Sequence, residues 1–292
     1  MVKFRKHISH GDGIVKMQDL VDSVFFEYDL AGKATYKKHS ESRWNLHLKP
    51  FFGDRETTEL TTRLQQEYQA KRRSEGAANA TINREMMILA KAYASGSEAE
   101  PPLVDKKPKF KLLKEDNARK RFISSDEFEA IRKAANEEGR WARVFIEFAY
   151  FYGWRKSELL RLRVGDVNLK DRWVRLSASK NGEPREVPMT TNLVGWAKPL
   201  VEHRDPASQL FPVKDFKYAW KRICDRAGLK SGKEGIVLHD FRRTSAREKR
   251  SRGVAEGVIM QMQGWKTSAM FRRYAIVDSE DKMDALRRME RL

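Results

Sequence analysis

Apolar residues recur at helical spacing along the first third of the chain. The pattern starts at Val15 and runs through Leu20 and Val21 to Phe25, after a polar lead, residues 1–13, that we expect to be flexible. Further helices are predicted over 36–48, 59–73 and 80–94. Gly96 and the pair Pro101-Pro102 end this pattern. Residues 14–100 are therefore predicted to form a small all-helical domain.

A second helical pattern begins just beyond residue 120. Ser124 and Glu127 have the spacing of a capping box, which starts a helix. Trp141–Tyr152 is strongly apolar and is followed by Gly153, a residue typical of helix C-termini. A short amphipathic helix is expected from Arg155 to Leu162. These signals indicate the start of a second domain, which we place at residues 121–275.

The hydrophobic period then changes from that of a helix to that of a strand. Trp173–Leu176 and Arg185–Met189 predict two strands, and Asn181-Gly182 between them predicts a hairpin turn. Beyond Thr190 the helical pattern returns. The predicted fold class is thus mainly α with a small antiparallel β-sheet, in two domains.

Two further segments carry a different signal. Residues 101–120 lack apolar periodicity and are rich in lysine and arginine, which predicts a basic interdomain linker. Residues 276–292 have apolar residues at helical spacing and predict a tail helix. This tail helix has two alternatives, packing on its own chain or on a neighbouring protomer.

Charge narrows the class of partner. The chain of 292 residues has a formal net charge of +18, of which residues 1–110 hold +4 and residues 111–292 hold +14. Such a field indicates a polyanionic partner, and nucleic acid is the leading choice. The sequence has neither a long apolar run nor a signal peptide, the features that would indicate a membrane. A cytoplasmic location is therefore expected. Cys224 is the only cysteine and the histidines are scattered, so no metal site is predicted.

A set of unlike polar groups indicates chemistry beyond DNA binding. Arg155 opens a helix at a rigid corner, with Glu158 three residues later on the same face. His239 and Arg242 also stand three residues apart and can converge on one point. Lys180 lies at the end of the predicted hairpin. Gly264-Trp265 precedes Tyr274 by a loop and a short helix, and Arg272 and Arg273 come directly before the tyrosine.

These motifs resemble those of the tyrosine recombinase, or phage integrase, family. Tyr152-Gly-Trp-Arg155-Lys-Ser-Glu158 is similar to the first catalytic box of the family, and Ser179-Lys180-Asn181-Gly182 to its hairpin lysine. His239-Asp-Phe-Arg242 matches the His-x-x-Arg box, and Gly264-Trp265 through Tyr274 has the spacing of the last box. Trp265 stands where many members have histidine.

The resemblance implies a role for each residue. Tyr274 is the nucleophile that forms a 3′-phosphotyrosyl intermediate with DNA, without metal or ATP. Arg155 and Arg242 clamp the phosphate, Trp265 donates one hydrogen bond, and His239 donates a hydrogen bond or relays a proton. Lys180 protonates the leaving 5′ oxygen. Glu158 is a supporting residue that orients Arg155 or His239.

The resemblance also implies the architecture and partners. A helical core-binding domain and a catalytic domain are expected to form a C-shaped clamp on double-stranded DNA, as a homotetramer on two DNA sites, with no cofactor. Additional DNA contacts are predicted from basic and polar positions: Lys37, Lys38, Arg43, Arg72, Arg73, Thr81, Asn83, Arg84, Lys109, Lys111 and Arg243.

Two alternatives to a site-specific recombinase remain from the residues alone. A type IB topoisomerase uses similar chemistry to relax supercoiled DNA, and a catalytically inactive protein would only bind DNA. The helical N-terminal domain and the tail favour recombination over relaxation. The complete set of six candidate catalytic residues argues against an inactive protein.

Overall fold

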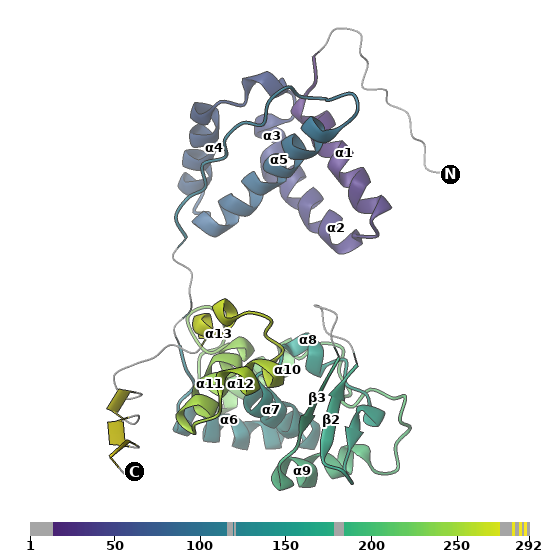
Figure 1. The fold of residues 1–292 in the computed structure, drawn as a ribbon, viewed down its shortest axis with the longest axis vertical. Helices are drawn as coiled ribbons and strands as arrows, with labels where there is room; N and C mark the ends of the chain where they lie inside the picture. The colour runs from purple at the N-terminus through teal and green to yellow at the C-terminus, as the bar shows by residue number, and fades with distance from the viewer. Residues whose placement is uncertain are drawn as a thin grey trace. The chain divides into compact units, whose positions relative to one another are not determined.

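The structure is a computed structural model with two compact units. Unit 1 is Met1–Arg119 and unit 2 is Lys120–Leu292 (Figure 1). The structure describes residues 14–115, 119, 121–177, 184–274, 282, 283, 286, 287, 289 and 290. Lys180 and most of the predicted tail helix lie outside the described residues.

The described part of unit 1 consists of helices and the loops that connect and follow them, as the sequence pattern predicts. Its elements are α1 (Met17–Leu30), α2 (Ala34–Arg43), the π-helical turn η1 (Trp44–Leu48), α3 (Lys49–Phe52), the 3-10 turn η2 (Thr57–Glu59), α4 (Thr62–Ser74) and α5 (Asn79–Glu98). The single helix predicted over 36–48 is wrong in one respect, because its last turn is π-helical. Pro50 has no N–H to donate to the preceding turn, and the Lys49 N–H bonds the Trp44 carbonyl five residues back.

The segment after α5 packs on the helices of unit 1. Val104 is buried in the same core as α1 and α5, and Phe110 and Leu113 lie against that core. Gln65 and Gln69 of α4 donate to the carbonyls of Lys109 and Lys111 at 3.0 and 2.8 Å. Much of the segment predicted to be a linker therefore forms part of unit 1.

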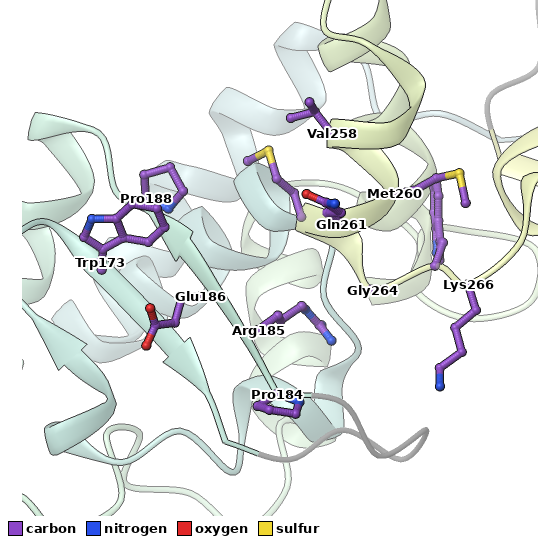
Figure 2. A pocket seen from close by; sticks show the side chains of 12 residues that line it. Trp173, Pro184, Arg185, Glu186, Pro188, Val258, Met260, Gln261, Gly264 and Lys266 are labelled. Atoms are coloured by element: carbon purple, nitrogen blue, oxygen red, sulfur yellow. The ribbon is translucent and has the colours of Figure 1, made fainter.

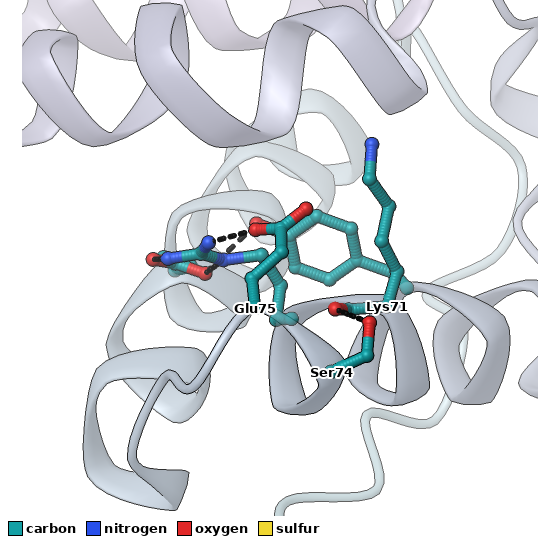
Figure 3. A network of polar contacts seen from close by, with 6 residues as sticks. Lys71, Ser74 and Glu75 are labelled. Carbon is teal, nitrogen blue, oxygen red and sulfur yellow. Dashed lines mark hydrogen bonds and ion pairs between the residues drawn. The ribbon is translucent and has the colours of Figure 1, made fainter.

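A buried polar network joins α4 to α5. The Glu85 carboxylate is fully buried and accepts hydrogen bonds from Tyr68 Oη at 2.8 Å and from Arg72 Nε and Nη2 at 3.0 and 2.9 Å. Glu75, at the end of α4, also contacts the Arg72 guanidinium (Figure 3). A buried carboxylate needs such donors, since an unpaired charge in a core is strongly destabilising.

Unit 2 contains most of the predicted catalytic residues. Its helices are α6 (Ser125–Glu138), α7 (Arg140–Tyr152), α8 (Lys156–Leu159), the 3-10 turn η3 (Val164–Asp166), α9 (Thr191–Val201), α10 (Lys217–Arg226), α11 (Leu238–Ser251), α12 (Glu256–Gln263) and α13 (Ser268–Tyr274). Helix α7 is the most buried, and α6, α9 and α11 pack around it. The capping box at Ser124 and Glu127 is confirmed by hydrogen bonds of 3.0 and 3.2 Å.

One three-stranded antiparallel sheet lies in the described part of unit 2. Its strands follow the order β1 (Val167–Asn168), β2 (Trp173–Leu176) and β3 (Arg185–Pro188). The predicted pairing of β2 with β3 is confirmed, with Val174 opposite Val187 on the buried face. The two-residue strand β1 was not predicted, because it is too short to show an alternating pattern. No helix in the described ranges is long and apolar enough to cross a membrane.

Candidate active site

The corner between α7 and α8 positions Arg155. Helix α7 ends at Gly153, which adopts the left-handed conformation with φ of 63°. Arg155 then caps α8, and its side chain donates from Nη1 to Glu158 Oε1 at 3.1 Å. The Arg155 backbone N–H also binds Glu158 Oε2 at 2.8 Å. Of the two residues that Glu158 was expected to support, Arg155 and His239, it is Arg155 that its carboxylate contacts.

Glu158 is held as a charged carboxylate in a buried place. It is 1% exposed. Burial alone would raise the pKa of Glu158, but the Arg155 backbone N–H and the charges of Arg185, Arg155 and Arg242 outweigh it and keep the pKa below its ordinary value.

Helix α11 places His239 and Arg242 one turn apart. Arg242 is 1% exposed, and its Nη1 donates to the Gly153 carbonyl at 2.6 Å, an orphan carbonyl at the end of α7. Arg242 Nη2 is buried and has no hydrogen-bond partner among the described residues. Burial, and then the charge of Arg155, lower the pKa of Arg242 to about 10, so the guanidinium remains charged at pH 7.

The turn after α12 brings Trp265 against the same guanidinium. Gly264 is left-handed, with φ of 67°, and ends α12. The Trp265 ring lies 4.9 Å from the Arg242 guanidinium carbon. Trp265 Nε1 is buried, and none of the described residues accepts its hydrogen bond. Two buried N–H donors from different elements thus lie close together without an acceptor in the described part of the chain, which favours an anion as their ligand.

Helix α13 places Tyr274 at the centre of these groups. Its ring stacks on Trp265, with centroids 5.1 Å apart and planes at 12°. Tyr274 Oη lies 2.9 Å from His239 Nε2. His239 is exposed as a whole residue, but partial desolvation of its ring by the groups packed around it, and then the charge of Arg242, lower its pKa below 6.5. The imidazole is therefore neutral at pH 7 and, in the tautomer with the proton on Nδ1, accepts a hydrogen bond from the phenol.

Arg185 is a member of this site that the sequence motifs did not predict. From β3 it donates to Glu158 Oε2 at 3.0 Å and its guanidinium lies 5.3 Å from the Trp154 ring centre. It also packs against Gly264, where an added Cβ would lie 2.4 Å from Arg185 Nη1. One signal was available: Arg185 is two residues before Val187, so it shares that residue's buried face.

Arg243, predicted as a DNA contact, is also part of the Tyr274 environment. It is 6% exposed, and its guanidinium lies 5.6 Å from the Tyr274 ring and 5.9 Å from the Phe122 ring. The side chain is therefore packed beside the tyrosine rather than displayed on the surface.

The predicted DNA contacts of unit 1 divide by burial. Arg72 is bound within the Glu85 network, and Asn83 is 4% exposed with hydrogen bonds of 2.8 Å to the Leu113 carbonyl and N–H. Both predictions are corrected, because these side chains stabilise unit 1 instead. Lys38, Arg73, Thr81, Arg84, Lys109 and Lys111 are exposed, and Lys37 and Arg43 are partly exposed.

A cavity of about 490 Å³ lies beside the site, between the sheet and α12. Figure 2 shows Trp173 and Arg185 on the sheet side and Val258, Gly264 and Lys266 on the other side. Lys180 lies outside the described residues, so the structure places only β2 and β3, which flank its segment.

Together, the fold and the site define a mainly helical domain in which buried cations and a tryptophan surround one tyrosine. Comparisons with known proteins agree with this class. The model of the phage integrase family matches residues 121–281. The chain belongs to this family.

The individual relatives are distant in sequence, and each match covers only part of this chain and part of the relative. The integrase of Salmonella phage P22 is 25% identical over 204 residues, which are 63% of this chain and 51% of that protein. A tyrosine recombinase of Thermosipho africanus is 24% identical over 177 residues, 58% of this chain and 61% of that protein. The chain therefore matches about half to three fifths of these relatives.

The fold also resembles a solved structure. The Tn1549 transposon integrase in complex with transposon right end DNA has a TM-score of 0.75 at 16% identity, and the match covers 94% of this chain and 100% of that chain. At this identity the likeness shows the fold.

Proposed function

We propose that this protein is a site-specific DNA recombinase that cleaves and rejoins DNA strands through a phosphotyrosine at Tyr274. One observation carries the proposal: His239, Arg242 and Trp265 surround Tyr274, and two of their buried N–H groups have no acceptor among the described residues. A DNA phosphate has the charge and the oxygen atoms that such donors bind.

The first step is attack by the Tyr274 phenol oxygen on the phosphorus. The new bond joins Tyr274 to the 3′ phosphate, and the bond from phosphorus to the 5′ oxygen breaks. His239 takes the phenol proton across the 2.9 Å contact. The leaving 5′ oxygen takes a proton from Lys180, whose role is carried over from the family resemblance. Reversal of these steps with another 5′ hydroxyl rejoins the strand, so bond energy is conserved and neither metal nor ATP is required.

The two arginines stabilise the negative charge of the transition state. Arg242 presents its unpaired Nη2, and Arg155 is oriented by the buried Glu158. Planar guanidinium groups match phosphate oxygens and keep their charge at neutral pH. Trp265 contributes a third donor from Nε1, which a histidine contributes in many members of the family.

The partner that we propose is double-stranded DNA, with the protein acting as a homotetramer on two sites. The net charge of +18 and the exposed basic residues of unit 1 support DNA as the partner. A lambda integrase tetramer bound to a Holliday junction has the same fold, with a TM-score of 0.70 at 17% identity. That assembly motivates the tetramer for this chain.

A capture experiment tests the proposal even though the target sequence is unknown. The protein is incubated with a library of random DNA duplexes that carry a nick, so that a short fragment leaves after cleavage and rejoining is prevented. The expected result is an SDS-resistant protein–DNA adduct enriched in one sequence. If no adduct forms on any library member, the proposal fails.

The same preparation separates recombination from topoisomerase activity. Supercoiled plasmid without the captured sequence should remain supercoiled, and a plasmid with two captured sites should yield recombinant products. Efficient relaxation of plasmid without a site would instead assign the protein to the topoisomerases.

A further inference from the structure

A fully buried glutamine lies behind the arginine clamp. Gln263 is the last residue of α12 and is 0% exposed. With its amide oriented by its neighbours, its oxygen accepts from Ala246 N at 3.1 Å and from Ser245 Oγ at 3.2 Å, and its nitrogen donates to the Arg242 carbonyl at 3.3 Å. All three partners belong to α11.

The position of Gln263 in its helix is one that favours an apolar residue. Ile259 and Gln263 are the buried residues of α12, and they are four residues apart on the same face. A buried amide is destabilising unless its polar atoms are bonded, whereas leucine at such a position would only need space. The three hydrogen bonds therefore indicate a requirement for a polar side chain at this place.

Gln263 also touches the corner that positions Arg155. A Cβ added to Gly153 would lie 2.9 Å from Gln263 Cδ, so the amide packs directly against that glycine. The next residue back, Met262, accepts a hydrogen bond from Trp154 Nε1 at 2.7 Å through its carbonyl. The end of α12 is thus tied to both α11 and the turn between α7 and α8.

These ties join the two halves of the phosphate site. Arg242 comes from α11, whereas Trp265 follows Gln263 by only two residues. Gly264, between Gln263 and Trp265, has a left-handed backbone and packs against the Arg185 guanidinium. The backbone that connects Gln263 to Trp265 is therefore short and closely packed. A shift of the Gln263 side chain would change the separation of the Arg242 and Trp265 donors.

We propose that Gln263 is a positioning residue that sets the distance between the Arg242 and Trp265 donors and thereby the fit of the transferred phosphate. The inference rests on the proposed function, because it assumes that both donors bind the phosphate at which Tyr274 reacts. Gln263 itself does not touch the substrate.

The test compares Gln263→Leu and Gln263→Met with Gln261→Leu. Both Gln263 variants keep a similar volume but lose the hydrogen bonds to α11, and methionine adapts to the site if leucine does not fold. Gln261 is exposed on the same helix, so its variant is the matched control for the chemical change. Each full-length protein is assayed on the DNA sequence captured by the wild type, once with the natural phosphate and once with a methylphosphonate at the cleaved position.

The two substrates distinguish positioning from general damage. The methyl group removes one charged oxygen, so the methylphosphonate depends less on correctly placed cationic donors. On the natural phosphate we expect the Gln263 variants to cleave about 10- to 100-fold more slowly in single-turnover assays, the range for misplacement of catalytic groups. Their DNA affinity should remain within about 3-fold of wild type, a difference below about 1 kcal/mol. On methylphosphonate the cleavage defect should shrink, and Gln261→Leu should match wild type on both substrates.

Three outcomes would overturn the inference. The first is cleavage of the natural phosphate by the Gln263 variants at the wild-type rate. The second is an equal loss of activity on both substrates, which would indicate a structural defect alone. The third is the same defect in Gln261→Leu. If the wild type forms no adduct on either substrate, the proposed function has failed instead.

Discussion

Arg242 carries a full charge in a buried environment that disfavours the charged form of its guanidinium. Its side chain is 1% exposed, and burial and Arg155 lower its pKa to about 10. The charged form is therefore less stable in the folded protein than in the unfolded chain, and this cost is present at all pH values below about 10. Such a feature is typical of functional sites, which retain charges that destabilise the fold.

Replacing this arginine should separate activity from stability. Arg242→Met removes the buried charge and retains much of the side-chain volume. We expect cleavage to fall by about 10²-fold or more, as for the loss of one oxyanion donor, and the melting temperature to stay equal or to rise. Thermal unfolding and single-turnover cleavage measure the two effects. A melting temperature lower by more than about 3 °C, or about 1 kcal/mol for a unit of this size, would show that Arg242 stabilises the fold.

His239 should give the cleavage reaction an acidic limit. Its pKa is lowered below 6.5 by partial desolvation of the ring and by the charge of Arg242, so the ring is neutral at pH 7 and can accept the Tyr274 proton. The cleavage rate should be constant just above pH 6.5 and fall as the pH drops through the lowered pKa. A pH–rate profile measured on the wild type checks this, and a rate that rises on acidification would contradict it.

The same shift predicts the direction of a stability change. Below pH 6.5 the unfolded chain binds a proton at His239 before the folded protein does, so acidification favours unfolding. Between pH 6.5 and the lowered pKa, the wild type should lose stability relative to His239→Gln. A constant difference in melting temperature across this range would refute this assignment.

Sequence predicted the candidate catalytic residues better than their supports. Arg155, His239, Arg242, Trp265 and Tyr274 occur in local motifs with fixed spacing. The supports, Arg185 and Gln263, act through contacts with residues far away in the chain; Glu158, for example, lies 27 residues before Arg185. No local pattern encodes such contacts.

At the scale of elements, the turn between α7 and α8 depends on the absence of a side chain. Gly153 and Gly228 are both left-handed, with φ of 63° and 70°, but only Gly153 has neighbours within reach of a Cβ. The two positions therefore provide a matched pair, equal in backbone strain and different in packing.

Alanine substitutions at this pair should differ in cost. Gly228→Ala should lower the free energy of unfolding by about 1 kcal/mol, the cost of a left-handed L-residue. Gly153→Ala should lower it by about 1–3 kcal/mol more, because its Cβ would displace Gln263, and it should also slow cleavage. Urea denaturation gives the comparison. Equal losses for the two variants would mean that Gln263 moves freely.

Helix α4 contains a second pair for comparison, the adjacent residues Arg72 and Arg73, which differ in burial. Leu64, Tyr68 and Arg72 are spaced by four residues and are all buried, whereas Arg73 is exposed. The four-residue spacing in the sequence is enough to place Arg72 on the buried face of the helix. The prediction that Arg72 contacts DNA followed from its charge and not from this spacing.

Alanine at these two positions should give contrasting phenotypes. Arg72→Ala leaves the Glu85 carboxylate without its guanidinium partner and should lower the free energy of unfolding by about 3–5 kcal/mol. Arg73→Ala should change the free energy of unfolding by no more than about 0.5 kcal/mol. It should weaken DNA binding and reduce the slope of log binding constant against log salt concentration by about 1. Denaturation and salt-titrated DNA binding measure these effects, and a stable Arg72→Ala would refute the structural role.

At the scale of the whole molecule, the hydrophobic pattern predicted the fold class, whereas the net charge led only to the proposal of a nucleic-acid partner. The period change at Trp173 and Arg185 marks the sheet because its strands are half-buried and alternate. The packing of residues 103–113 on the helices of unit 1 was not predicted, because Val104, Phe110 and Leu113 follow neither a helical nor a strand period. The other contacts are backbone carbonyls bound by Gln65 and Gln69. Backbone acceptors leave no trace in the sequence.

The most direct test of the central claim is the identity of the residue that bonds to DNA. Wild-type protein and Tyr274→Phe are incubated with the captured nicked duplex, and adducts are digested and analysed by mass spectrometry. The wild type should yield a nucleotide linked to the peptide that contains Tyr274, and the phenylalanine variant should bind the duplex equally but form no adduct. An adduct on another residue, or equal trapping by Tyr274→Phe, would contradict the assignment of Tyr274 as the nucleophile.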